Sequence, residues 1–247
     1  MKINKLIILT FLSLLMISCE DETDIYNKKD PQLSVVSFIK RIDVFSVITG
    51  NNIYKLKVGT TKIFETDQTF EVVLNSETTG NVSQYSMEST SITIPAGKLS
   101  GFTNIDFNFD VLIPGAAEIL VFDLIVPDGI GQNVSLQKTT VKYSRPCNFN
   151  LLTLDITFDD YSEETSWDVK DSNDTIVYSN NYVAGIGQTS ELVCLPSGNY
   201  IFTIYDVYDD GICCTYGDGS YTLYDNSNTY ASGDAFGQFE STSFTIN

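Results

Sequence analysis

The stretch YDVYDDGICCTYGDGSY, Tyr205 to Tyr221, holds most of the groups in this chain that could do chemistry. Four carboxylates lie within thirteen residues, interleaved with glycines: Asp206, Asp209, Asp210 and Asp218. Calcium takes about six to eight oxygen ligands, which closely spaced aspartates and the carbonyls of glycine-bent turns can supply. The order does not match an EF-hand loop, so two interpretations stay open: a calcium site, or Asp-Gly turns on an acidic surface.

Two adjacent cysteines stand in the same stretch. Apart from Cys19, the chain has four cysteines, an even number that predicts two disulfides in an oxidising compartment: Cys147, Cys194, Cys213 and Cys214. Three pairings are possible. Because adjacent cysteines bridge each other only through a strained ring, we expect Cys213 and Cys214 to have different partners. A thiol nucleophile is disfavoured by the acidic neighbours, and zinc is disfavoured because two CxxC pairs are absent.

Tyrosines are the third group with a possible function. Four of them lie in or beside these loops: Tyr208, Tyr216, Tyr224 and Tyr230. An exposed ring next to acidic and amide groups can stack on a sugar ring, which makes these residues candidates for ligand binding. The alternative is that the rings pack on ordinary strands and only their hydroxyls reach water.

The composition excludes several functions. The chain of 247 residues has no histidine, which rules out Ser-His-Asp and Cys-His catalysis and the HExxH zinc proteases. Adjacent carboxylate pairs, Asp159/Asp160 and Glu163/Glu164, would point to opposite faces of a strand and match no catalytic signature. We therefore predict that the protein is not an enzyme. A formal net charge of −18 argues against nucleic acid, whose phosphates demand Lys and Arg.

The N-terminus reads MKINKLIILTFLSLLMISC. Two lysines precede an apolar run that is short for a membrane span and ends in a small residue before Cys19. This pattern resembles a bacterial lipobox, which implies cleavage after residue 18 and acylation of Cys19, a stable membrane anchor. An ordinary secretory signal with an incidental cysteine is the alternative. Residues 1–18 are thus the expected lipoprotein signal peptide and residues 19–32 a lipidated acidic linker.

The linker begins EDETD. This acidic run resembles the export signal that takes some Gram-negative lipoproteins to the outer face of the outer membrane, so we expect a location there, facing the cell exterior. Retention in the periplasm, with the run as a solvated linker, is the alternative.

Charge divides the remainder into two regions. Residues 30–146 carry 9 basic and 12 acidic residues, whereas residues 147–247 carry 1 and 16. The segment YSRPCNF marks the change, and each region is long enough to bury a core. We predict an all-β chain of two tandem β-sandwich domains, residues 33–146 and residues 147–247.

The first region shows the period-two alternation of half-buried strands. IYKLKVG sets Tyr54, Leu56 and Val58 on one face, and six further segments bring the expected count to about seven, which suits an immunoglobulin-like sandwich. TFEVVLN and NIDFNFD place Leu74 and Phe109 on inward faces. SITIPAGKLSGFTNIDFNFD and EILVFDLIVPDG resemble the second half of a Calx-beta domain. The resemblance implies that fold, while the acidic residues here are too scattered to carry over its calcium site.

The second region alternates in the same way, in LLTLDITF, TSWDV and NYIFTIYD, and predicts a jelly-roll-like or Ig-like sandwich. ETSW, CLPSGNYIFTIYD and DDGICCTYGDGSY resemble a module found at the C-termini of secreted and surface proteins of polymer-degrading bacteria. That resemblance implies fold and location and no established activity.

Two functional hypotheses follow. The first is a lipid-anchored cell-surface binding protein that captures polysaccharide or another extracellular polymer, with calcium as a candidate cofactor. The second is a structural or adhesion lipoprotein that contacts other envelope proteins. Exposed tyrosines around the 205–221 loop favour the first, and buried tyrosines with an exposed apolar strand edge favour the second.

Overall fold

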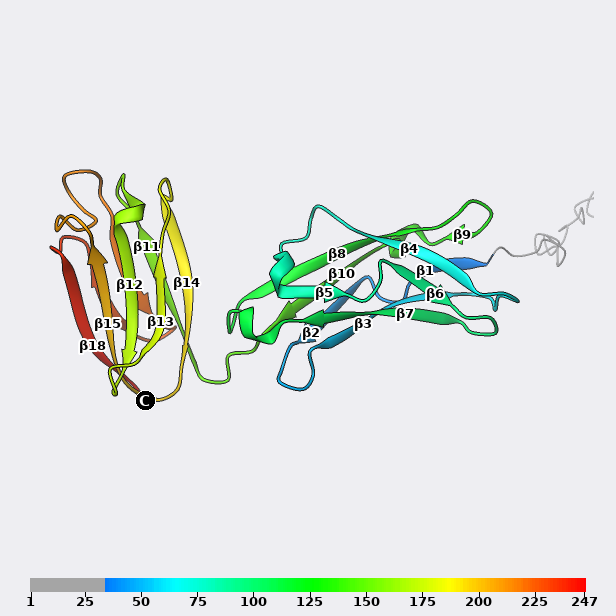
Figure 1. Cartoon of the computed structure of the whole chain (residues 1–247), viewed down its shortest axis with the longest axis horizontal. Coiled ribbons are helices and arrows are strands. Elements are labelled where there is room, and N and C mark those ends of the chain that lie inside the picture. Colours follow the sequence, from blue (N-terminus) through cyan, green and yellow to red (C-terminus); the bar gives the residue numbers. More distant parts are fainter. Residues whose placement is uncertain (1–33) are drawn as a thin grey trace, which may run out of the picture. The chain divides into compact units, whose positions relative to one another are not determined.

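The computed structural model describes residues 34–247 (Figure 1). The predicted signal peptide, Cys19 and the acidic linker lie outside the described residues. The described chain is built of strands and four single 3-10 turns, which confirms the all-β prediction. Within this part of the chain, no helix has the length and apolar character needed to cross a membrane.

The first sandwich has two five-stranded sheets, ordered β5-β7-β3-β1-β9 and β2-β10-β8-β4-β6. Its strands are β1 (Val35–Phe38), β2 (Ile42–Ser46), β3 (Ile53–Thr60), β4 (Gln68–Leu74), β5 (Tyr85–Met87), β6 (Ser91–Ile94), β7 (Ser100–Phe107), β8 (Ala117–Ile125), β9 (Gly131–Gln132) and β10 (Lys138–Ser144). The seven predicted strands are present, and the structure adds the short strands β2, β5 and β9. These three were missed because each is too short, or too exposed, to show a clear alternation.

The faces of the first sandwich follow the sequence pattern with two exceptions. Leu56 and Val58 are buried as predicted, and Tyr54 packs against the same core. Leu74 is 41% exposed, because it is the last residue of β4, beyond the covered part of the sheet. Phe109 packs against the core as predicted but not from a strand: β7 ends at Phe107, and Phe109 begins a 3-10 turn, where its ring also lies under the guanidinium of Arg145.

The second sandwich has eight strands, all paired antiparallel, in sheets ordered β14-β11-β16-β17 and β13-β12-β15-β18. The strands are β11 (Asn150–Thr157), β12 (Thr165–Asp171), β13 (Ile176–Asn181), β14 (Gln188–Leu195), β15 (Gly198–Asp206), β16 (Ser220–Tyr224), β17 (Thr229–Gly233) and β18 (Phe239–Ile246). The second of these sheets faces the viewer at the left of Figure 1.

The core of the second sandwich holds the side chains that alternation placed inward. Leu152, Leu154 and Ile156 are buried on β11, opposite Trp167 on β12. The indole Nε1–H of Trp167 donates a 2.8 Å hydrogen bond to the hydroxyl of Tyr182, so the single tryptophan is buried with its polar atom satisfied. This core and that of the first sandwich are separate clusters, and the domain boundaries at residues 33–146 and 147–247 stay predictions.

Two disulfides join the four cysteines of the described chain. Cys147 bonds to Cys194, and Cys213 bonds to its neighbour Cys214. The predicted number is therefore confirmed, but the expected pairing is wrong, because we expected the two adjacent cysteines to reach different partners.

The register of β11 explains the pairing. Cys194 lies opposite Leu151 at the beginning of β11, whereas the 207–219 loop leads into β16 beside Thr157, the last residue of β11. Six residues of extended chain separate these ends by about 20 Å. Disulfide-bonded cysteines need Cα atoms within about 7 Å, so Cys213 and Cys214 are out of reach of the first pair.

Candidate functional site

Four connections meet at one end of the second sandwich, which we call the loop end. They are residues 158–164, 182–187, 207–219 and 234–238, all drawn at the top of that domain in Figure 1. Backbone hydrogen bonds hold them together: Asp160 N–H donates to the Tyr216 carbonyl, and Val207 N–H donates to the Glu164 carbonyl. Gly211 allows a close approach, since an added Cβ would lie 2.3 Å from a carbonyl oxygen of the 234–238 connection.

Three carboxylates gather at the loop end. Oxygen atoms of Glu164, Asp206 and Asp210 lie within 4.8 Å of one another. The carboxylate of Asp206 is buried, at 4% exposure, while Asp210 is exposed and Glu164 is intermediate. The three charges thus run from the edge of the core to the surface.

Asp206 is held in place by the turn that follows it. Its Oδ1 accepts hydrogen bonds from the backbone N–H groups of Tyr208, at 2.9 Å, and Asp210, at 3.1 Å. The turn passes through Asp209 and Gly211, both in the left-handed region with φ near +70°. This conformation folds Asp210 back over the end of β15, next to the residue from which the turn started.

Burial and mutual repulsion act on the pKa values of this group. Burial raises the pKa of Asp206, the charge of Asp210 adds to the shift, and the backbone donors oppose it. Burial also raises the pKa of Glu164, with further contributions from the charges of Asp206 and Asp210. Three like charges in a partly buried site favour a bound cation, which would lower both pKa values.

The donor set suits calcium more than a transition metal. All three side chains offer hard carboxylate oxygens, and no histidine exists to add nitrogen. Thr165 lies opposite Asp206 on β12, buried, and its hydroxyl oxygen has no hydrogen-bond partner. Directly opposed residues share one face with Cβ atoms about 5 Å apart, so this hydroxyl adds a candidate oxygen beside the carboxylates.

The predicted metal residues divide in two. Asp206 and Asp210 come together, whereas Asp209 and Asp218 are exposed and lie outside the group. Glu164 was not among the predicted ligands. It stands 42 positions before Asp206, and only the antiparallel pairing of β12 with β15 brings it close, so no local signal could have identified it.

The predicted tyrosines divide in the same way. Tyr208 and Tyr216 are at the loop end, 71% and 46% exposed, and the ring of Tyr216 meets that of exposed Tyr161 edge to face at 5.4 Å. Tyr224 and Tyr230 lie at the opposite end, around the β16–β17 turn, where their hydroxyls donate to Asp155 and Asp225.

No protein-family model and no curated protein matches this chain. Among solved structures, it is similar to a putative carbohydrate binding protein from Bacteroides ovatus, with 15% identity, coverage of 84% of this chain and 74% of that one, and a TM-score of 0.38. It is also similar to CBD12 from CALX1.2, with 11% identity, coverage of 70% and 81%, and a TM-score of 0.38. An auxiliary nutrient binding protein from Bacteroides thetaiotaomicron is similar as well, with 10% identity, coverage of 83% of this chain and 91% of that one, and a TM-score of 0.34. Similarities this distant carry no functional argument.

Proposed function

We propose that this protein is a non-catalytic binding protein, anchored to the outer membrane by a lipid on Cys19, that captures an extracellular polysaccharide at the loop end. The observation that carries the proposal is the placement of exposed tyrosine rings beside a carboxylate group. Tyr161, Tyr208 and Tyr216 supply apolar faces for sugar rings, and the acidic group supplies acceptors for sugar hydroxyls.

Calcium is part of this proposal. Glu164, Asp206 and Asp210 would hold the ion, with the Thr165 hydroxyl as a further candidate ligand. Bound calcium would neutralise the group and fix the 207–219 loop that carries Tyr208 and Tyr216. Polymer binding would then depend on calcium through the position of these rings.

Affinity gels test the loop end directly. The soluble chain from Glu20 onward, with its disulfides formed, is run through gels containing single polysaccharides, with calcium or with chelator. Retardation should be lost on chelation and weakened about tenfold or more by Tyr216→Ala. Tyr224→Ala is the matched control, since it removes the same ring from the opposite end of the sandwich. Equal retardation of both variants would refute a tyrosine platform at the loop end.

The lipid anchor has its own test. Cys19→Ser should move the protein from the membrane fraction to the soluble fraction, and protease treatment of intact cells should remove the protein if it faces the exterior. Retention in the membrane after Cys19→Ser would contradict the anchor, and protection from protease would favour the periplasm.

A structural or adhesion role is the second candidate, and one observation favours it. Strand β2 is at the edge of its sheet in the first sandwich, and Ile42 and Val44 on it are exposed. An exposed apolar edge strand is a common docking site for another protein. Capture of an envelope protein that is lost in Val44→Lys, with no polysaccharide bound, would support this role.

A further inference from the structure

The second sandwich carries another surface whose chemistry suits a ligand. It is the outward side of the sheet β13-β12-β15-β18, which we call the β15 face. On β15, Asn199, Ile201, Thr203 and Tyr205 lie on the outward side, alternating with residues of the core, although Thr203 is itself 5% exposed. These positions span about 20 Å along the strand, long enough for an oligosaccharide.

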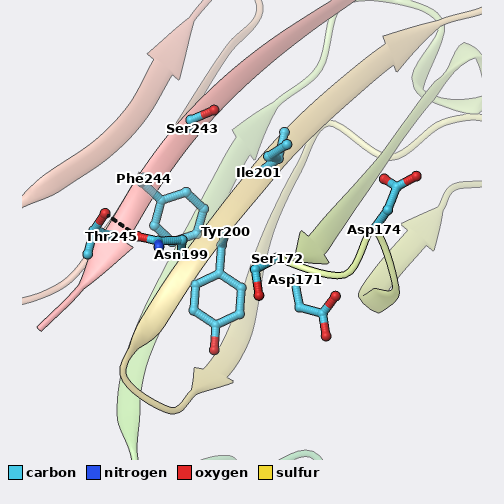
Figure 2. Close-up of a pocket in the computed structure, with 9 residues that line it drawn as sticks. All are labelled: Asp171, Ser172, Asp174, Asn199, Tyr200, Ile201, Ser243, Phe244 and Thr245. Carbon is cyan, nitrogen blue, oxygen red and sulfur yellow. Dashed lines mark hydrogen bonds between the residues drawn. The ribbon is translucent and has the colours of Figure 1, made fainter.

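A hollow of about 540 Å³ occupies one end of the β15 face (Figure 2). Figure 2 shows Ile201 and Ser243 on neighbouring strands, with Asp171 at the end of β12 and Asp174 in the β12–β13 turn on the other side of Ile201. Asn199 also lines the hollow, where its side-chain oxygen accepts a 2.8 Å hydrogen bond from the hydroxyl of Thr245. Hydroxyl, amide and carboxylate groups therefore surround one shallow depression.

Aromatic rings occupy the other end of the face. Phe239 on β18 is 56% exposed and lies opposite Tyr205 on β15, with ring centroids 6.3 Å apart. The Tyr205 hydroxyl donates a 2.9 Å hydrogen bond to Oδ2 of Asp168 on β12, which fixes the ring against the sheet. An exposed ring of this kind offers a stacking surface.

Between the two ends lies an unusual carboxylate. Asp168 points outward but is only 7% exposed, and its Oδ1 has no hydrogen-bond partner. It belongs to a row of small polar residues across the sheet, with Thr203 and Ser241 next to it. A buried carboxylate oxygen without a donor costs free energy, so this position is suited to receive a donor from a ligand.

We propose that the β15 face is a second binding site, independent of metal, for a neutral polysaccharide chain lying along β15. Phe239 stacks on one sugar ring, Asp168 accepts a sugar hydroxyl, and the hollow beside Ser243 holds the next part of the chain. Because Oδ1 of Asp168 is buried, side chains around it must shift before a sugar hydroxyl can reach it. This site shares with the proposed function only the class of ligand.

The charges and the strand pairing of this sheet favour a neutral polysaccharide as the ligand. Lys170 is the only basic residue between Cys147 and the C-terminus, and it forms an ion pair with Asp174 at 3.6 Å. Asp168, together with Asp171 and Asp174 at the hollow, leaves this surface negative, so an anionic polymer is repelled. Strands β12 and β15 are paired on both sides, so a peptide cannot add to them as a further strand. Recognition over β12 and β15 therefore uses side chains, and these are mostly groups that form hydrogen bonds with hydroxyls.

The test compares two identical substitutions on opposite sheets. Ser243→Arg fills the hollow, and Ser190→Arg places the same side chain on an exposed position of β14. Both variants of the soluble chain from Glu20 onward are run through gels containing xyloglucan, mixed-linkage β-glucan, galactomannan or mannan, all in chelator. Ser243→Arg should weaken retardation by at least one of these polymers about tenfold or more, and Ser190→Arg should leave it unchanged.

Further measurements separate this site from the loop end. Asp168→Asn should weaken the same binding about tenfold, since it removes the charged acceptor, while Asp218→Asn, at an exposed aspartate outside the carboxylate group and the β15 face, should leave it unchanged. Polymer should protect residues 199–205 and 239–245 from hydrogen exchange. Three outcomes would overturn the proposed site on the β15 face. They are no retardation by any of the four polymers in chelator, equal binding by the two arginine variants, and binding of a peptide instead of a polysaccharide. Loss of binding on chelation alone would instead leave the loop end as the binding site.

Discussion

Calcium should stabilise the second sandwich through the carboxylates at the loop end. The change to be made is Asp210→Asn, which removes one charge from the group of Glu164, Asp206 and Asp210 without adding volume. Asp218→Asn is the matched control, since Asp218 is an exposed aspartate of the same loop outside the group. Both variants are compared with the unchanged protein by differential scanning calorimetry.

The expected stabilisation by calcium follows from the number of protein ligands. Three carboxylates with an open, exposed side correspond to the weak class of calcium sites, with Kd about 0.1–1 mM. At about 10 mM calcium, this affinity stabilises the folded state by about 1.4–2.7 kcal/mol. For a unit of roughly 100 residues, that free energy raises Tm by about 7–13 °C.

The two variants should differ in their response to calcium. The unchanged protein and Asp218→Asn should show the full calcium-dependent rise in one unfolding transition, and Asp210→Asn should lose most of it. Magnesium at the same concentration should give a smaller rise, because it demands a near-ideal octahedral site. An equal rise in both variants, or no rise in any protein, would refute calcium binding by this group.

Three further predictions concern stability. The pKa of Glu164 is raised in the folded state, so its contribution to stability grows as pH falls through that value. In chelator, the Tm should therefore climb from pH 7 toward about pH 5, and Glu164→Gln should flatten this climb. An unchanged climb in the variant would show that other carboxylates cause it. Gly211→Ala should destabilise far more than Gly185→Ala in urea unfolding, since both have positive φ but only Gly211 faces a backbone oxygen at 2.3 Å, and equal losses would contradict the close approach. Replacing Cys147 and Cys194 together by serine should cost about 4 kcal/mol, the loop-closure value for their separation of 47 residues, and a loss under about 1 kcal/mol would argue against the bond.

Local pattern was sufficient for the strands and for much of the core. Alternation identified which side chains of β3, β11 and β15 face inward, because a strand places successive residues on opposite faces whatever its partners are. It failed at the strand ends, for example at Leu74, where burial depends on how far the neighbouring strands extend. Strands β5 and β9 were missed because strands of three and two residues are defined by their hydrogen-bonded partners, and β2 was missed because its apolar residues Ile42 and Val44 are exposed.

The number of disulfides and the acidic, histidine-free chemistry of the loop could be read from the sequence, since both follow from which residues are present. Which residues meet was decided by the tertiary structure. The register of β11 puts Cys194 about 20 Å from the loop, which left Cys213 to bond with Cys214. The pairing of β12 with β15 puts Glu164 beside Asp206, while Asp209 and Asp218 lie outside this group of carboxylates. Contacts between residues far apart in the chain depend on strand register, and register is set by the packing of both sheets together.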